Sequence, residues 1–285
     1  MKRIIIPTDF SFRTPKIIEA GVRLATQMNV AVEIVHVIDS FEYGVNFVIS
    51  ESTPIILPPD ILNDQVGKAQ EKFHEIVASL KKDKGRIPEI FMSVKTGFVF
   101  DVIAEQLQDP DVILVMLNDK SQADYNYRDV SINFSEIINH SNSPVCVVPN
   151  NAPFKDPKNI IYAFNYHEQD LENIFDLKGI ADLVGANIHI LHVVAEKSIK
   201  DKYAMLGLEK ELQEKMDVKN IVFKVIESKD IVKAIDDYAH IIEGDMITIL
   251  RANKSLFQGI FGSNKTREII YKTNLPVLVY QERKK

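Results

Sequence analysis

The chain has 285 residues, of which 46% are hydrophobic and 26% are charged, and its formal net charge is −6 at pH 7. This length suits two globular domains, and the acidic balance argues against nucleic acid or an anionic membrane as a partner, since phosphate groups demand a basic surface. We find no signal peptide and no apolar run near the roughly 18 residues of a membrane span, so we expect a cytoplasmic protein.

The first half of the chain alternates short runs of Val, Ile and Leu with segments of helical periodicity. A buried-strand run at 3–7 ends in turn residues, after which Thr14 and Pro15 mark the start of a helix. The later elements are predicted in the order strand 32–38, helix 64–82, strand 90–95, helix 99–108, strand 112–117, helix 132–142 and strand 145–148. Such an alternation predicts a parallel sheet with helices on both faces.

The second half repeats this order. Ile160 follows Ile4 by 156 residues, as His192 follows His36. We expect Asp170 to cap the first helix of this half, and the later elements to be strands 188–194, 221–226, 246–250 and 277–280 and helices 203–216, 230–242 and 264–274. This duplication predicts two domains, 1–150 and 151–285, with 149–159 as the linker.

Equivalent residues of the two halves are 156 positions apart near the start of each half but only 132 apart near its end. The first half therefore holds about 24 extra residues. They form an insertion at about 40–60. Its apolar side chains are too many for a solvated loop, so we expect it to fold over the cleft of the first half or onto the second half. The side chains concerned are Phe41, Tyr43, Phe47, Ile55, Ile56 and Leu57.

Four short motifs carry a family resemblance. They are RIIIPTDFS at 3–11, LHV at 191–193, SPVCVVP at 143–149 and LPVLVY at 275–280. In this order, and doubled, they resemble the universal stress protein (UspA) family over essentially the whole chain. The resemblance implies two tandem, doubly wound, five-stranded parallel sheets of α/β class and strand order 3-2-1-4-5, related by a pseudo-twofold. Pairing of 145–148 with 277–280 would cover two apolar edges, and a further homodimer is allowed but not required.

The nucleotide-binding branch of that family holds ATP where the strand order reverses. The resemblance assigns the residues after the first strand to the adenosine, and a loop of pattern G-x2-G-x9-G-[S/T] to the phosphates. The second half keeps Gly262 and Ser263 of this loop but lacks the earlier glycines, and Val130 replaces the glycine in the first half. The candidate nucleotide-binding residues are Pro7, Thr8, Asp9, Asn165, Ala252, Gly262, Ser263, Asn264 and Lys265.

Simpler structural roles compete with several functional ones. Asp9 either holds an adenosine or caps the turn after the first strand with its own backbone hydrogen bonds. Ser263 either holds a phosphate oxygen or caps a helix. We expect His36 and His192 to be core histidines with one hydrogen-bonded nitrogen, because no Cys or acidic residue recurs at metal-ligand spacing. Cys146 lies in an apolar run and is expected to be a buried thiol.

Catalysis finds no support in these residues, since the chain has no Gly-x-Ser-x-Gly elbow and no Ser/His/Asp constellation. We therefore interpret the chain as a non-catalytic binding or regulatory module of the stress response, with degenerate nucleotide sites and an unidentified signalling partner. The alternative is a sensor that weakly binds ATP or another adenosine nucleotide, with magnesium, at Gly262-Ser263-Asn264 in the second domain. An adenylyl-transferring enzyme would need an intact glycine loop.

Overall fold

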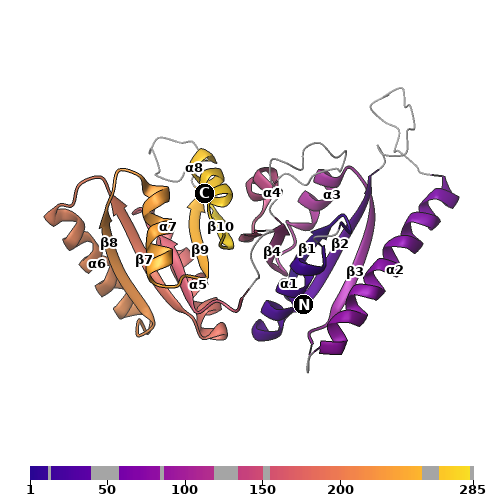
Figure 1. The fold of residues 1–285 in the computed structure, drawn as a ribbon, viewed down its shortest axis with the longest axis horizontal. Coiled ribbons are helices and arrows are strands. Elements are labelled where there is room, and N and C mark those ends of the chain that lie inside the picture. Colours follow the sequence, from indigo (N-terminus) through magenta and orange to yellow (C-terminus); the bar gives the residue numbers. More distant parts are fainter. Residues whose placement is uncertain are drawn as a thin grey trace. The chain divides into compact units, whose positions relative to one another are not determined.

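The computed structural model describes residues 1–11, 14–39, 58–83, 87–118, 134–149, 155–251 and 263–282. The chain forms two compact units, Met1–Val145 and Cys146–Lys285, and each is treated below by itself. Figure 1 shows in both of them a sheet with helices packed against it.

The sheet of the first half has the strand order β3-β2-β1-β4-β5, with parallel pairing from β3 to β4, and the boundary between the two units falls after the first residue of β5. Its strands are β1 (Arg3–Thr8), β2 (Ala31–Asp39), β3 (Ile90–Gly97), β4 (Val112–Asn118) and β5 (Val145–Val148). β1 and β2 are buried along almost their whole length, as expected of central strands covered on both faces. The outer strand β3 is only half-buried.

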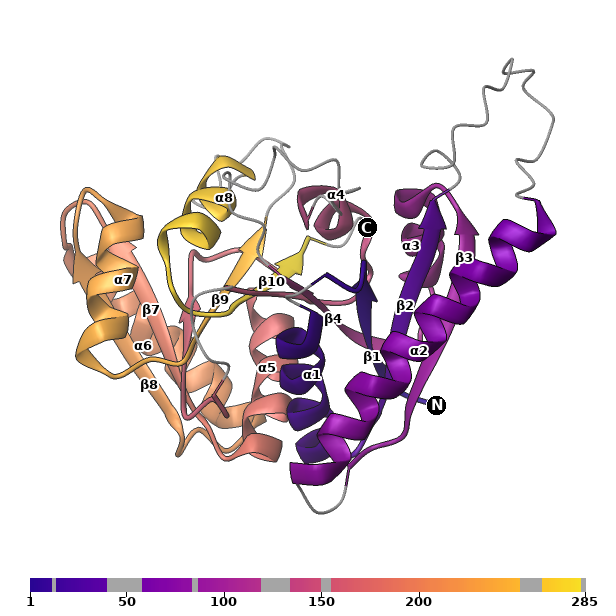
Figure 2. The ribbon, with the colours of Figure 1, turned by 45° about the vertical axis from the view of Figure 1, so that its right-hand side comes forward.

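Helices cover both faces of this sheet. They are α1 (Thr14–Met28), α2 (Pro59–Asp83), α3 (Val99–Gln106) and α4 (Phe134–His140). Right-handed crossovers from β1 to β2 and from β2 to β3 place α1 and α2 on one face, and α3 and α4 on the other. Figure 2 shows α2 running beside β2 and β3. The α1 helix lies so close to β1 that a Cβ added at Gly21 would come within 2.4 Å of Ile6 Cδ1.

The second unit has the same design, with strand order β8-β7-β6-β9-β10. Its strands are β6 (Asn159–Ala163), β7 (Asn187–Val194), β8 (Ile221–Glu227), β9 (Met246–Arg251) and β10 (Val277–Gln281). Its helices are α5 (Asp170–Val184), α6 (Ile199–Lys215), α7 (Ile231–Ile241) and α8 (Ser263–Lys272). The predicted fold class, two parallel five-stranded sheets of order 3-2-1-4-5 with helices, is confirmed.

Some expectations fall at or beyond the limits of the described residues. α2 begins at Pro59, inside the predicted insertion, and the rest of that insertion, 40–57, lies outside the described residues. The pseudo-twofold and the pairing of 145–148 with 277–280 concern the relation between the units and stay predictions. Of the helices in the described part of the chain, none has the length and apolarity that crossing a bilayer requires.

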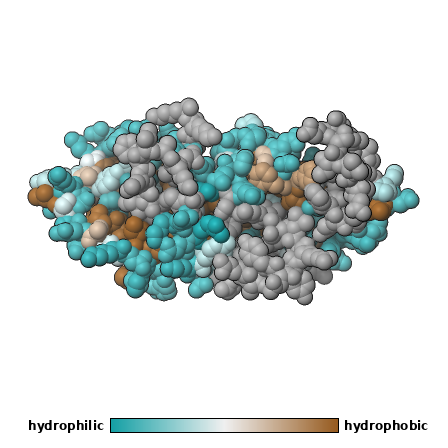
Figure 3. Space-filling view, turned by 90° about the horizontal axis from the view of Figure 1, so that it is seen from above, coloured by the Kyte–Doolittle hydropathy of each residue, from teal (hydrophilic) through white to brown (hydrophobic). Residues whose placement is uncertain are grey.

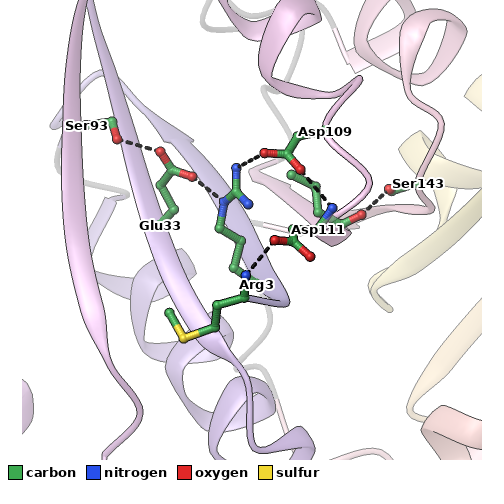
Figure 4. A network of polar contacts seen from close by, with 8 residues as sticks. Arg3, Glu33, Ser93, Asp109, Asp111 and Ser143 are labelled. Carbon is green, nitrogen blue, oxygen red and sulfur yellow. Dashed lines mark hydrogen bonds and ion pairs between the residues drawn. The ribbon is translucent and has the colours of Figure 1, made fainter.

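A charged network ties the amino ends of β1 and β2 to the loop before β4 (Figure 4). The Arg3 guanidinium donates to the Glu33 carboxylate through Nε and to Asp109 through Nη2, the latter at 2.9 Å. Glu33 is only 4% exposed and also accepts a hydrogen bond from the Ser93 hydroxyl. The backbone N–H of Asp111 and then Arg3 hold the pKa of Asp109 below its usual value. This network stabilises the edge opposite to the carboxyl ends of the strands.

Candidate functional site

A cavity of about 230 Å³ lies in the first unit, at the carboxyl ends of β1 and β2 and against α2. Open parallel sheets bind their ligands at this edge, so the cavity is the first candidate for a site. Figure 3 looks onto this edge, where the described residues are mostly hydrophilic. The residues that line the cavity are Asp9, Phe10, His36, Val37, Ile38, Asp39, Gln65, Lys68, Ala69 and Lys72.

The turn from β1 to α1 forms the edge of the cavity. Asp9 Oδ1 accepts a hydrogen bond from the Ser11 N–H at 2.9 Å, which is the turn-capping role expected of it. Thr8 Oγ1 accepts from the Phe10 N–H at 3.0 Å and lies 2.8 Å from Thr14 Oγ1. These bonds hold Phe10 at φ 53°, a left-handed conformation that non-glycine residues rarely adopt. The turn thus presents the Phe10 ring to the cavity.

His36 has one nitrogen tied to the backbone, as predicted. Its Nδ1 lies 2.9 Å from the Thr8 carbonyl oxygen. A carbonyl oxygen only accepts, so Nδ1 carries the hydrogen of this bond. The Phe10 ring packs on this imidazole with 5.0 Å between ring centroids. Together the two rings give the cavity an aromatic wall, while Asp9 and Asp39 add carboxylates from the strand ends.

The opposite wall of the cavity belongs to α2. Gln65, Lys68, Ala69 and Lys72 recur at the spacing of one helical face and all line the cavity. Lys68 Nζ pairs with the Asp64 carboxylate at 2.6 Å, and both side chains are more than half exposed. Lys72 Nζ lies 6.0 Å from the centroid of the Phe10 ring. The cavity therefore has two ammonium groups on its helix wall and two carboxylates on its strand wall.

The second unit repeats the histidine arrangement at the carboxyl ends of its own strands. His192 Nδ1 lies 2.9 Å from the Phe164 carbonyl oxygen, again as predicted for a core histidine. Tyr166, at φ 64°, packs its ring on His192 with 4.4 Å between centroids. Phe10 and Tyr166 are 156 residues apart, as are His36 and His192. The ring pair is thus a shared feature of both halves.

Asn165 and Asp170 organise the corresponding turn in a different way. Asp170 is 1% exposed and accepts from the Tyr162 hydroxyl at 2.7 Å and from the His167 N–H at 2.8 Å. The Asn165 N–H also points to this carboxylate, at 3.3 Å. The expectation that Asp170 caps α5 is therefore wrong, because its acceptors serve the preceding loop and Gln169 is the cap residue. Burial raises the pKa of Asp170, and burial and Asp170 raise that of Tyr162.

The second helix of the second unit, α6, has an acidic residue near His192, whereas α2 has lysines at the cavity of the first unit. α6 begins with a capping box in which Ser198 and Asp201 bond each other's backbone N–H groups. Hydrogen bonds from Ser198 and then the nearby His192 hold the pKa of Asp201 below its usual value. The Ser-x-x-Asp spacing could have placed the helix start at 199 rather than at the predicted 203. In the second unit a carboxylate thus lies near the histidine at the strand ends.

The predicted site residues are only partly brought together. Pro7 and Thr8 end β1, and Asp9 follows the strand and lines the cavity. Ala252 and Gly262 lie outside the described residues, so the loop predicted to bind an anion stays a prediction. Ser263, Asn264 and Lys265 open α8, where Lys265 Nζ pairs with Glu268 at 2.7 Å. Lys265 and Lys272 lower the pKa of Glu268 to about 2.

Other candidate chemistry is limited within the described residues. Cys146 is fully buried, as predicted, and burial raises the pKa of its thiol to about 12. The thiolate that a nucleophile needs is therefore disfavoured. Within the same residues, no three His, Cys, Asp or Glu side chains gather closely enough to hold a metal ion.

The family model of the universal stress proteins matches residues 1–149, more than half of the chain. The chain belongs to the universal stress protein family. A universal stress protein from Archaeoglobus fulgidus DSM 4304 is similar in structure, with 16% identity and a TM-score of 0.65, over 98% of this chain and 96% of that one. A protein of unknown function from Pseudomonas aeruginosa PAO1 has 11% identity and a TM-score of 0.58, over 99% and 92%. No curated protein matches the chain.

Identities this low show a shared fold and no shared ligand. The family membership supports a role in the stress response. The cavity at Asp9, His36 and α2, in contrast, is a property of this chain's own residues. Any statement about its ligand has to be argued from their chemistry.

Proposed function

We propose that this protein is a cytoplasmic, non-catalytic binding module of the stress response, and that its ligand site is the cavity of the first unit. One observation carries the proposal, namely that a cavity with aromatic, acidic and basic walls lies at the ligand-binding edge of the sheet. Asp9 has a turn role and also lines this cavity, so the two interpretations of Asp9 are compatible.

The chemistry of the walls indicates the kind of ligand. The Phe10 and His36 rings offer a surface for a planar group, and the Asp9 and Asp39 carboxylates at the strand ends suit its N–H or O–H donors. A purine nucleoside or its phosphate has these features. Among the described residues that line the cavity, none is a nucleophile activated by an adjacent base, and this supports binding without turnover.

The test combines ligand binding with a variant that fills the cavity. Adenosine, AMP, ADP and ATP, with and without magnesium, are added at millimolar concentration while the melting temperature is followed. A micromolar ligand then adds about 4 kcal/mol to the free energy of unfolding. Replacing Ala69, which is buried in the cavity wall, by Met should abolish the shift. The control replaces the exposed Ala204 of α6 by Met and should leave it unchanged.

Three results would count against the proposal. The absence of any shift with all four compounds would remove the binding function. Steady release of phosphate from ATP would show catalysis. A shift that survives Ala69→Met but is lost in Gly262→Val would move the site to the second domain, which is the alternative sensor.

A further inference from the structure

Lys68 and Lys72 lie one helical turn apart on the face of α2 that lines the cavity. Resting on the proposed function, we propose that they form an anion subsite. The ligand of the first unit then bears one compact anionic group, a phosphate monoester or a carboxylate, which the two ammonium groups bind from α2. The rest of the ligand lies against the strand ends.

The ion pair of Lys68 is a weak competitor for an anion. Lys68 pairs with Asp64, but both side chains are more than half exposed, and solvent screens such surface pairs strongly. Lys72 lies above the Phe10 ring, so its ammonium is positioned at the aromatic wall. An anion between the two ammonium groups would have charge-assisted hydrogen bonds from both sides.

The sequence of the first half also favours α2, rather than the stretch after β4, as the place where the anionic group binds. The stretch after β4 holds Val130 at the position that matches Gly262, and it carries Asp119, Asp124 and Asp129. Val disfavours the backbone turn that cradles a phosphate, and three carboxylates repel an anion. In the part of the chain that the structure describes, the cations that line the cavity are those of α2.

The other groups of the cavity fix the opposite end of the ligand. Asp9 and Asp39 would repel an anion and attract donors, while Phe10 and His36 offer ring faces. The ligand is therefore amphoteric, with donors on a planar ring at the strand wall and a negative charge at the helix wall. The cavity volume of about 230 Å³ is below the 300–1,000 Å³ of common ligand pockets and favours a single phosphate over a triphosphate.

The second unit provides an internal contrast. Its helix α6 brings Asp201 near His192, where α2 brings lysines to the cavity of His36. A carboxylate repels the group that an ammonium attracts. Of the two helices compared, α2 is the one that places lysines at a cavity in the described part of the chain.

The test compares charged and neutral probes by titration calorimetry. AMP should bind the wild type at least tenfold more tightly than adenosine. In Lys68→Gln/Lys72→Gln the two should bind alike, with the affinity for adenosine unchanged. Lys68→Arg/Lys72→Arg should keep most of the difference. The matched control is Lys215→Gln, which removes a similar exposed pair, Lys215 with Glu211 on α6, and should change nothing.

Adenosine 5′-carboxylic acid distinguishes the two anion types, because tighter binding than AMP would identify a carboxylate ligand. Equal affinities of AMP and adenosine in the wild type would overturn the subsite while leaving the binding function intact. A preference for AMP that persists in the double Gln variant would do the same. If the wild type binds none of the probes, the proposed function fails and the subsite fails with it. Circular dichroism of each variant checks that it is folded.

Discussion

The two units share a strand order but differ in what fills the space beneath their first helix. In the first unit this space holds Ile6 and Met116, which pack against Gly21 of α1. In the second unit the residues at the same spacings are Tyr162, Thr248 and Leu177, all of them buried. The same sheet therefore tolerates either an apolar or a polar layer at this place.

The polar layer is satisfied at Tyr162 and Asp170, whereas the buried Thr248 Oγ1 has no hydrogen-bond partner among the described residues. The Tyr162 hydroxyl donates to Asp170, and the same carboxylate accepts from the loop N–H groups that follow β6. Thr14 stands at the position of Asp170 in the first unit, and its hydroxyl bonds that of Thr8. A buried polar group is tolerated when its hydrogen bonds are complete and is costly when they are not.

The amino-terminal edges of the two sheets also differ, and here it is the first unit that has the charged residues. The first unit has the charged Arg3 and Glu33 there. At the same spacing the second unit has Asn159 and His189, and His189 Nδ1 lies 3.0 Å from the Tyr238 hydroxyl. Burial lowers the pKa of His189, so this ring tends to be neutral. Buried charge thus lies at the amino edge of one unit and near the carboxyl edge of the other.

The largest effect is expected from Arg3→Met, which leaves the buried Glu33 carboxylate without its cation. The first unit should lose about 3 kcal/mol of unfolding free energy, and the second unit should be unaffected. Hydrogen exchange read by mass spectrometry reports the two units separately. Arg3→Met/Glu33→Met should recover most of the loss, because no charge is then stranded. A loss below about 1 kcal/mol in the single variant would show that water already solvates Glu33.

Asp170→Ala tests the polar layer of the second unit. It leaves the Tyr162 hydroxyl and the His167 N–H without their acceptor, and we expect a loss of about 2–3 kcal/mol. The matched change in the first unit, Thr14→Ala, removes one hydroxyl pair and should cost about 1 kcal/mol. Urea unfolding followed with hydrogen exchange measures both. Equal losses would contradict the idea that Asp170 organises more than Thr14 does.

Gly21→Leu gives the first unit the residue type that the second unit has at the equivalent position, Leu177. The space at Gly21 is already filled by Ile6 Cδ1, so we expect overpacking to cost about 2 kcal/mol. Adding Ile6→Ala should restore at least half of this loss by making room. If the single variant is as stable as the wild type, α1 can move away from the sheet, and the close approach has no energetic role.

The smallest effect concerns the residue after the first helix of each unit. Asn29 has φ 53° and Gly185, 156 residues later, has φ 70°. Glycine adopts this conformation without strain, so Asn29→Gly should stabilise the first unit by about 0.5 kcal/mol, and Gly185→Ala should destabilise the second by about 1 kcal/mol. Melting curves of the two variants should shift in opposite directions. Shifts of the same sign would contradict this account.

The fold was predictable because buried parallel strands read as apolar runs and the chain contains this pattern twice. The role of Glu33 was not predictable, because a single acidic residue inside the run VEIVHVID gives no sign that the Arg3 side chain reaches it from the neighbouring strand. The role of Asp170 was missed because a helix-capping Asp and a buried Asp look alike in one sequence. The helix wall of the cavity was missed because Lys68 and Lys72 read as an ordinary solvated face until β2 is placed beside α2.

The pairing of Tyr162 with Asp170 also restricts how one half of such a chain can diverge from the other. Starting from the arrangement of the first unit, a tyrosine in place of Ile6 would bury a hydroxyl with only Thr14 near its site, and an aspartate in place of Thr14 would bury a carboxylate beneath an aliphatic side chain. Each replacement is unfavourable alone and acceptable in the presence of the other. Residues at these two positions should therefore change together among relatives, and a chimera that exchanges only β1 for β6, without the following helix, should fold poorly.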